Sequence, residues 1–537
     1  MRFARNRKQP RRGALLLVVL VVVALLSVSN LAYYDWTFTE RQAANVSTRW
    51  SQSRASAESG IEYVRAYLTL DRETIEQDGG WYDNPQRFEG VLLVNDPSSE
   101  LRTRFSVLAP QYQRERLAGA RHGLEDESGR LNLNTLLIAE TRETDAGRNQ
   151  LLELPGMTSA IADAILDWID EDDDTRTLGA ELSYYASLTT PYAPANAPFS
   201  SIEQLLQVKG VTRELLYGPD QNRDHRATAT ELANTALQDV DNADGALDGG
   251  WASMLTLSSA ELNLRSDGEP KINVNADDLE QLHSDIELEF GLDVANYVIA
   301  YRQGGPENTE SNEEQDDGPV EVGGQEITPP NSEVKNATDI VLDFSQPGAT
   351  RIQSVLELIG GRARVVEQNQ VSGETLVESP FSDDPGSFSS YLTDLMDLLT
   401  TTDSELIPGR ININQAPRAV LRGVPGMPSE AVDAILASRD PSAGSSRPER
   451  ETAAWLLGEG YVDLEDMLAM EPYVTGRGDV YRVQVVGSFD SGGPFCRLEA
   501  VIDATLTEPR IVLRRDLSAL GLGHSTAVLD PLVEDEF

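Results

Sequence analysis

Residues 13–34 read GALLLVVLVVVALLSVSNLAYY, an almost wholly apolar run long enough to cross a bilayer as a helix. The preceding twelve residues carry six basic side chains and no acidic one. Because basic residues beside such a span stay on the cytoplasmic side, the chain is expected to cross the inner (cytoplasmic) membrane once, with its N-terminus in the cytoplasm. The remaining body, about 500 residues, then lies in the periplasm.

Three interpretations of the N-terminus compete. A secretory signal would be removed near residues 30–32, where the small-residue pattern is weak, and a plain signal anchor would not be cut. In the third interpretation, residues 1–13 are a basic prepilin-type leader that ends at Gly13, and the mature chain begins at Ala14 with a transmembrane helix over 14–34. Residues 35–70 continue as an amphipathic helical stem, which favours the third interpretation.

Composition restricts the class of partner. The chain has 44 basic and 88 acidic residues, a net charge of −44. Such a body repels phosphate backbones, so nucleic acid is not an expected partner. Its one cysteine, Cys496, excludes an intrachain disulfide.

A basic-apolar-Asn-apolar-Asn motif occurs three times, at Arg130–Asn134, Lys271–Asn275 and Arg410–Asn414. The copies begin about 140 residues apart, and each precedes a helical stretch, which indicates a repeated unit. The predicted units span 130–250, 251–390 and 391–475. In this division Trp251–Leu257 opens the second unit and Tyr391–Leu399 the third.

The first and third units contain two apolar helices around a Pro-Gly turn, at Pro155-Gly156 and Pro425-Gly426. This pattern matches a helix-hairpin-helix of the SAM-like kind, which is known for holding DNA phosphates through turn amides. The helix after the first turn runs into Asp170-Glu-Asp-Asp-Asp174, which would repel phosphate. A packing role is therefore expected for the hairpins.

Predicted strands lie at both ends of the body. Residues 80–129 include Phe88–Val94 and Arg102–Leu108, and residues 478–515 include a hairpin of Val480–Val486 with Phe495–Ile502. The fold class is therefore α+β, with a small antiparallel sheet interrupted by a large helical insertion. Residues 303–333 are expected to form a disordered acidic loop, and 516–537 a tail.

The acidic run after the first hairpin is the main candidate site. Counted from Asp170, the residues Asp172, Asp174 and Glu181 fall at places three, five and twelve of an EF-hand loop. Thr175 stands at the sixth place, where the sharp turn requires glycine, so the match is partial. The alternatives are a calcium site and a solvated acidic helix end.

Other motifs are less informative. Residues 239–248 have a calcium-like composition without EF-hand spacing. The four histidines and Cys496 stand in no recognisable catalytic pattern. We expect an assembly component and not an enzyme.

A set of motifs in this order resembles the type II secretion minor pseudopilin K (general secretion pathway protein K). These motifs are the leader ending at Gly13, Asp126–Asn134, Leu154–Met157, Asp167–Asp170, Gly179–Glu181 with Tyr184-Tyr185, Pro198–Glu203 and Lys271–Asn275. The resemblance implies a pilin-like fold whose long N-terminal helix packs on the sheet, and a place at the tip of a periplasmic pseudopilus with the minor pseudopilins I and J. It also implies prepilin peptidase as processing enzyme and calcium in the insertion. Secreted cargo and the outer-membrane channel are further candidate partners.

The position after the leader also favours a tip subunit. Pilins commonly carry glutamate at the fifth mature residue, and counting from Ala14 this residue is Val18. Two features depart from the family pattern: Ala14 replaces a bulky apolar residue, and an extra repeat spans about 353–470. The alternatives are a minor pilin of a type IV pilus, a membrane-anchored helix-hairpin-helix receptor for DNA uptake, and a calcium-dependent adhesin.

Overall fold

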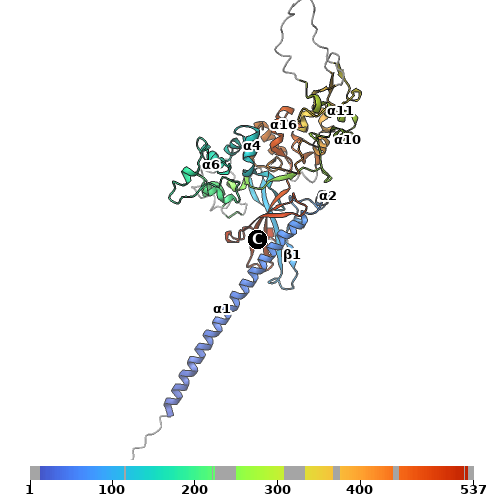
Figure 1. The fold of residues 1–537 in the computed structure, drawn as a ribbon. Coiled ribbons are helices and arrows are strands. Elements are labelled where there is room, and N and C mark those ends of the chain that lie inside the picture. Colours follow the sequence, from blue (N-terminus) through green and yellow to red (C-terminus); the bar gives the residue numbers. More distant parts are fainter. Residues whose placement is uncertain are drawn as a thin grey trace, which may run out of the picture.

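A computed structural model describes residues 12–113, 116–220, 222–223, 249–307, 333–366, 375–439, 447–524 and 526–529. Helix α1 (Arg12–Tyr67) is one unbroken element of 56 residues and contains both the apolar run and the stem. The helix is long and apolar enough to cross a membrane over part of its length. Figure 1 shows α1 projecting from the body, and only its upper end lies against other elements.

The upper end of α1 packs on an antiparallel sheet. Ala57, Ile61 and Val64 on one face of the helix are almost fully buried against the sheet. Gly60 lies at the closest approach, because a Cβ atom there would stand 2.5 Å from a methyl carbon of Val485. The helix and the sheet thus form one small hydrophobic core.

Strands from both ends of the body build this sheet in the order β1-β2-β16-β17-β18, with β3 beside β2 and β4 beside β16. β2 and β16 pair although more than three hundred residues separate them. The strand bounds are β1 (Val91–Val94), β2 (Thr103–Gln113), β3 (Arg116–His122), β4 (Glu125–Asp126), β16 (Val480–Phe489), β17 (Cys496–Asp503) and β18 (Arg510–Asp516). The predicted sheet interrupted by a helical insertion is present. Phe88, however, ends the short helix α3 (Pro85–Phe88), because Asn84 caps that helix and Pro85 occupies its first turn.

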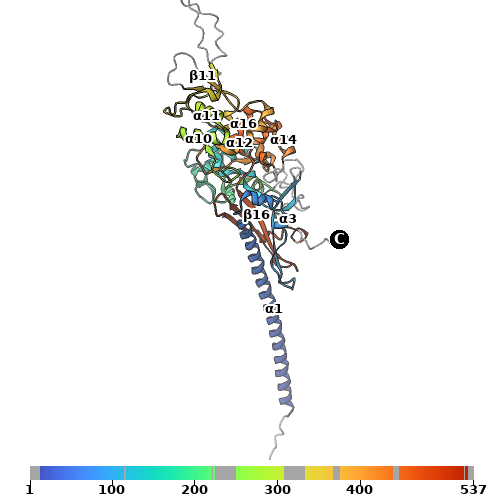
Figure 2. The same cartoon turned by 90° about the vertical axis from the view of Figure 1, so that its right-hand side faces the viewer.

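The insertion between β4 and β16 holds three units, and Figures 1 and 2 place the second of them at the end of the molecule opposite the free end of α1. Unit 1 contains β5 (Leu131–Asn132), α4 (Leu136–Arg142), α5 (Ala146–Leu152), α6 (Ser159–Ile169), α7 (Leu182–Tyr185), α8 (Arg213–Tyr217) and β6 (Leu255–Thr256). Unit 2 contains β8 (Ile272–Asn273), α10 (Leu279–Phe290), α11 (Leu292–Gly304), β9 (Glu333–Lys335), β10 (Arg362–Val365), β11 (Thr375–Glu378), α12 (Leu392–Leu398) and β12 (Leu399–Thr400). Unit 3 contains β14 (Ile411–Asn412), α13 (Arg418–Arg422), α14 (Ser429–Ser438), α15 (Trp455–Gly458), α16 (Leu464–Met470) and β15 (Val474–Thr475). A short antiparallel pair, β7 (Ala260–Leu262) with β13 (Leu406–Pro408), links the units.

The repeated motif closes each unit on itself. Its strand pairs in parallel with the last strand of the same unit: β5 with β6, β8 with β12, and β14 with β15. The final asparagine of each motif (Asn134, Asn275, Asn414) donates from its amide nitrogen to two backbone carbonyls of that unit. The motif is therefore a structural clasp that joins the beginning of a unit to its end.

These pairs cross the predicted unit boundaries. The predicted divisions at 250/251 and 390/391 would separate β6 and β12 from the motifs that they pair with. Trp251–Leu257 closes the first unit and does not open the second, and the segment that ends in Leu399 closes the second. A parallel pair two residues long has no periodicity that a sequence pattern could reveal.

Two predicted irregular segments are partly ordered. Gln303 and Gly304 end α11 and Glu333 begins β9, while residues 308–332 lie outside the described part of the chain. Within the predicted tail, Leu529 is 4% exposed, and its carbonyl accepts a hydrogen bond from Ser106 of β2. Val528 and Leu529 thus contact the sheet, and residues 525 and 530–537 are not described.

Candidate functional site

The acidic loop, residues 170–181, begins where α6 ends. Two aspartates on the buried face of α6 hold the loop against the helix. Asp167 is fully buried and accepts hydrogen bonds from the backbone nitrogen of Ala180 at 2.8 Å and from the side chain of Arg176 at 3.0 Å. Asp163 accepts from Arg148 at 2.6 Å and from the backbone of Leu178 at 3.1 Å. The loop is therefore fastened at its middle and at its end.

Gly179 makes this approach possible. A Cβ atom at this position would lie 1.9 Å from a carboxylate oxygen of Asp167. No side chain can be accommodated there without moving the loop away from α6. The Gly179–Glu181 motif thus has a steric basis.

The structure separates the four predicted calcium ligands into two pairs. Asp170 and Glu181 are 9% and 2% exposed, whereas Asp172 and Asp174 face solvent. One oxygen of Asp170 pairs with Arg176, and the other, Oδ1, has no hydrogen-bond partner. Asp172 accepts a hydrogen bond from the backbone of Asp174 at 2.8 Å.

Glu181 is the unusual group of the loop, because both of its carboxylate oxygens are buried without a partner. Burial, together with the neighbouring charges of Asp167 and Asp170, raises the pKa of Glu181 to about 7. A buried carboxylate with no partner is costly, and a hard cation is one group that would satisfy its oxygens. Among the described residues, however, no three His, Cys, Asp or Glu side chains stand close enough to hold a metal ion. The calcium site stays a prediction, and residues 239–248 lie outside the described part of the chain.

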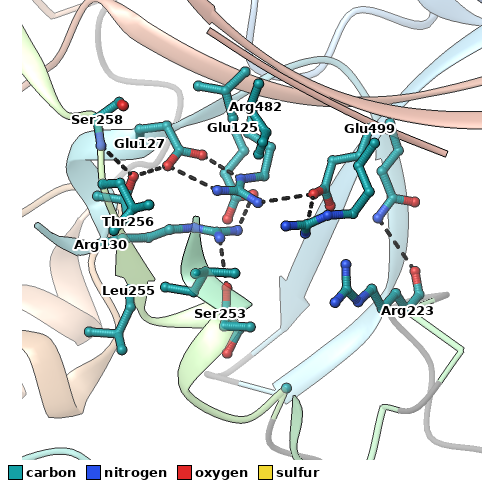
Figure 3. A pocket seen from close by; sticks show the side chains of 18 of the residues that line it. Glu125, Glu127, Arg130, Arg223, Ser253, Leu255, Thr256, Ser258, Arg482 and Glu499 are labelled. Atoms are coloured by element: carbon teal, nitrogen blue, oxygen red, sulfur yellow. Dashed lines mark hydrogen bonds and ion pairs between the residues drawn. The ribbon is translucent and has the colours of Figure 1, made fainter. Parts of the chain in front are cut away.

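A second cluster of charged side chains lies where the sheet contacts unit 1. We call this contact the junction and define it by Glu125, Glu127, Arg130, Arg482 and Glu499. These side chains line a cavity of about 320 Å³ (Figure 3). Arg482 from β16 pairs with the fully buried Glu127 and, at 3.3 Å, with Glu499 from β17. Arg130 pairs with Glu125 at 2.6 Å.

The arginines decide the ionisation of the junction. Burial alone would raise the pKa of Glu127, but Arg482 and Arg130 outweigh it and hold the pKa below its ordinary value. The pKa of Glu499 is lowered in the same way, against burial, by Arg482 and Arg515. Each of these carboxylates therefore stays ionised and paired, which makes the junction a structural joint. No local sequence pattern indicates this joint, because its partners come from distant parts of the chain.

Asp126 extends this joint to unit 3. Its carboxylate is fully buried and accepts hydrogen bonds from the backbone nitrogens of Ser128 and Gly478 and from the amide of Asn412, at 2.7–2.8 Å. Burial nevertheless raises the pKa of Asp126 to about 7. One side chain of β4 thus connects the turn before the first motif, the residue pair before β16 and the third motif.

The two Pro-Gly turns are partly exposed, and each contacts another element of its own unit. Trp251 donates from its indole nitrogen to the carbonyl of Pro155 at 2.8 Å. A Cβ atom on Gly426 would lie 2.8 Å from the Cβ of Ala469 in α16. Both turns are therefore engaged in packing within their units.

The processing and filament residues lie on α1. Gly13 and Ala14 fall within the first turns of the helix, and Val18 is 59% exposed. Almost every side chain between Leu15 and Trp50 is likewise exposed. Arg49, near the end of this segment, bonds to Ser491 and to the carbonyl of Gly492 in the turn after β16, whereas the apolar residues 15–34 lie bare along the helix.

Together these features define a class: a protein with one N-terminal helix able to anchor it in a membrane, an antiparallel sheet packed on the end of that helix, and a large helical insertion. Residues 129–217 match the family described as type II secretion system (T2SS), protein K. This match agrees with the resemblance seen in the motifs, over this part of the chain.

Two relatives found by sequence are named for the same family. Type II secretion system protein K of Pectobacterium carotovorum subsp. carotovorum is 28% identical over 215 residues, which cover 38% of this chain and 60% of the relative. A protein of Escherichia coli strain K12 named for the same family is 42% identical over 60 residues, 11% of this chain and 18% of its own. A chain in the crystal structure of the GspK-GspI-GspJ complex from the enterotoxigenic Escherichia coli type 2 secretion system aligns with a TM-score of 0.31 and 11% identity, over 89% of this chain and 99% of that chain.

Proposed function

We propose that this protein is a non-enzymatic minor pseudopilin of a type II secretion system that starts or caps the pseudopilus at its tip. One observation carries the proposal: a match to the protein K family lies within the insertion of a body whose N-terminal helix leaves its apolar run uncovered. A bare apolar helix of this length can sit in a membrane and then pack among similar helices of a filament. The fold is then pilin-like, and the hairpins are SAM-like packing units.

The proposed topology places the basic N-terminus in the cytoplasm and the body in the periplasm. Prepilin peptidase would cut after Gly13 and release Ala14 as the first mature residue. Mass spectrometry of the membrane-extracted protein tests this step, since the mature mass must correspond to a chain that begins at Ala14. A mature start near Tyr33 would identify an ordinary signal peptide and contradict the proposal.

The tip position rests on Val18 and on the bulk of the body. A subunit with Val18 has no carboxylate inside the helix bundle, where such a charge is costly unless it is paired. Three insertion units would also obstruct another subunit stacked above. We expect about one copy per filament, at one end, by immunogold labelling. Labelling along the whole filament would exclude the tip position.

The proposed partners are minor pseudopilins I and J. Co-purification of the full chain with these two proteins from detergent-extracted membranes tests this part. A Val18→Glu variant should still co-purify and should be tolerated or mildly harmful to secretion, because the body is unchanged. Secreted cargo and the outer-membrane channel remain further candidate partners.

We also propose that the acidic loop holds calcium. Glu181 and Asp170 fit this role, because they present three buried carboxylate oxygens that have no protein partner. A bound cation would neutralise the loop and hold it against α6. Asp172 and Asp174 are expected to reach such an ion only from the solvent side.

A further inference from the structure

A cavity of about 510 Å³ lies where the upper end of α1 meets the insertion, and we call it the stem cavity. Its walls come from residues 68–82, which include α2 (Arg72–Gln77), from the loop after β7, from the third motif and from the start of β16. Every residue that lines it belongs to the described part of the chain. Neither the clasps nor the acidic loop accounts for this cavity.

Part of the lining of the stem cavity is apolar and aromatic. Leu68, Ile75 and Leu264 line it together with Trp81 and Tyr481. The two aromatic rings meet edge to face, with centroids 5.0 Å apart. Such a wall can hold an aliphatic stem and can also attract a cation over a ring face.

The charged residues of the lining include more acids than bases. Six carboxylates line the cavity against three guanidinium groups. Two of the acids are paired, Glu451 with Arg477 at 2.6 Å and Asp479 with Arg72 at 3.4 Å. Burial, together with the neighbouring carboxylates Glu76 and Asp479, nevertheless raises the pKa of Glu451 to about 7. The cavity therefore favours a ligand with positive charge.

Comparison of the three clasps reveals an unused hydrogen-bond acceptor in this cavity. In units 1 and 2 the amide oxygens of Asn134 and Asn275 accept from a backbone N–H, at 2.8 and 2.9 Å. The corresponding oxygen of Asn414 is buried without a partner, because the amide of Arg450 is bonded within its own turn. Asn414 is 2% exposed and lines the stem cavity.

A donor in the same cavity is also unused. The Nη1 nitrogen of Arg72 is buried without a partner, although Nη2 pairs with Asp479. The backbone of an extended peptide offers a partner for each group: its N–H can donate to Asn414, and its carbonyl can accept from Arg72. A bare metal ion could satisfy the carboxylates but offers no acceptor for the unused nitrogen of Arg72.

We propose that the stem cavity receives an extended segment of a partner protein that inserts a lysine or arginine side chain between the carboxylates Glu451 and Glu76 and the rings of Trp81 and Tyr481. The backbone of this segment bonds to Asn414 and Arg72. The partner thereby contacts the stem, the sheet and unit 3 together. This proposal does not depend on the role in secretion, since it concerns only what the cavity binds.

The test uses the purified full chain in detergent and two fluorescein-labelled synthetic pentapeptides. One peptide alternates valine with lysine, and the other alternates valine with glutamate. We expect saturable binding of the basic peptide by fluorescence anisotropy and at least about tenfold weaker binding of the acidic one. Glu451→Gln should weaken binding of the basic peptide about tenfold, because it removes the charge that faces the basic side chain.

Asp433→Asn is the matched control, because Asp433 is exposed on α14, pairs with Arg418 and lies outside the cavity. This variant should bind the basic peptide as the unmodified chain does. A benzophenone group on the peptide should cross-link to residues of the cavity such as Leu264 or Tyr82. Absence of binding, equal binding of the two peptides, equal effects of both variants or cross-links elsewhere would each overturn the proposal.

Discussion

The acidic loop and the junction are two regions dense in buried carboxylates, and they differ in what neutralises them. In the junction Arg482 and Arg130 reach Glu127, Glu499 and Glu125, and the pKa values of Glu127 and Glu499 are lowered. In the acidic loop Arg176 is the one described base that pairs with the carboxylates, and it reaches Asp167 and Asp170. Glu181 is left without a partner, and its pKa is raised.

This difference distinguishes a joint from a candidate binding site. Charges that are paired within the chain hold the sheet and the insertion together and require no ligand. Carboxylates that are buried without a partner destabilise the fold until a proton or a cation neutralises them. Local charge density alone does not separate the two cases, because the deciding arginines come from elsewhere in the chain.

The largest expected effect is at the junction. Glu127→Gln removes a fully buried charge and leaves Arg482 with Glu499 as its one remaining carboxylate partner among the described contacts. Breaking such a buried pair should lower the free energy of unfolding by about 3 kcal/mol or more. Chemical denaturation followed by circular dichroism measures this change.

The acidic loop supplies the control for this variant. Asp174→Asn changes an exposed carboxylate to an amide and should alter the free energy of unfolding by less than about 0.5 kcal/mol. If the two variants were equally stable, the junction would not be a structural joint. The junction and the acidic loop would then not differ in how their carboxylates are neutralised.

The second effect is the gain from calcium at the acidic loop. A ligand that binds only the folded state, at a concentration a hundred times its dissociation constant, raises the free energy of unfolding by about 2.7 kcal/mol. Millimolar calcium should therefore raise the melting temperature. Glu181→Gln should abolish this gain, and Glu127→Gln should retain it despite its lower starting stability. An unchanged melting temperature of the unmodified chain in calcium and in chelator would mean that the loop is only a solvated acidic run.

Much of the architecture could be predicted from the sequence. The uninterrupted apolar run and the amphipathic stem after it predict the continuous helix α1, and hydrophobic alternation predicts β16 and β17. Strands at both ends of the body with helices between them predict the sheet interrupted by the insertion. The three motifs also indicated a repeated unit.

The parts of the structure that could not be predicted depend on contacts between residues far apart in the sequence. The two-residue strands β6, β12 and β15 are defined only by their partners, so the unit boundaries could not be placed. Glu127 and Arg482 are 355 residues apart, and nothing local to either one indicates the pair. Counting from Asp170 likewise omitted Asp167, which precedes the loop and whose place on the buried face of α6 was the available signal.

The smallest effect is on the pH dependence of stability, and it has opposite signs in the two regions. The pKa of Glu181 in the folded protein is raised from 4.5 to about 7, so the folded state binds the proton more tightly than the unfolded state. Its contribution is therefore full below about pH 4.5 and is lost as the pH rises toward 7. Glu127 and Glu499 have lowered pKa values, so their contribution is present above about pH 4.5 and is lost only as the pH falls through those lower values.

In chelator, raising the pH from 5 to 7.5 should therefore lower the free energy of unfolding of the unmodified chain. Asp126 and Glu451 also have pKa values raised to about 7 and contribute in the same direction. The useful measurement is thus a comparison of the unmodified chain with Glu181→Gln. The free energy of unfolding of this variant should fall by about 2 kcal/mol less over this range. Calcium at pH 7.5 should restore the stability of the unmodified chain alone. If the two proteins gave parallel curves, Glu181 would not be the unneutralised group that distinguishes the acidic loop from the junction.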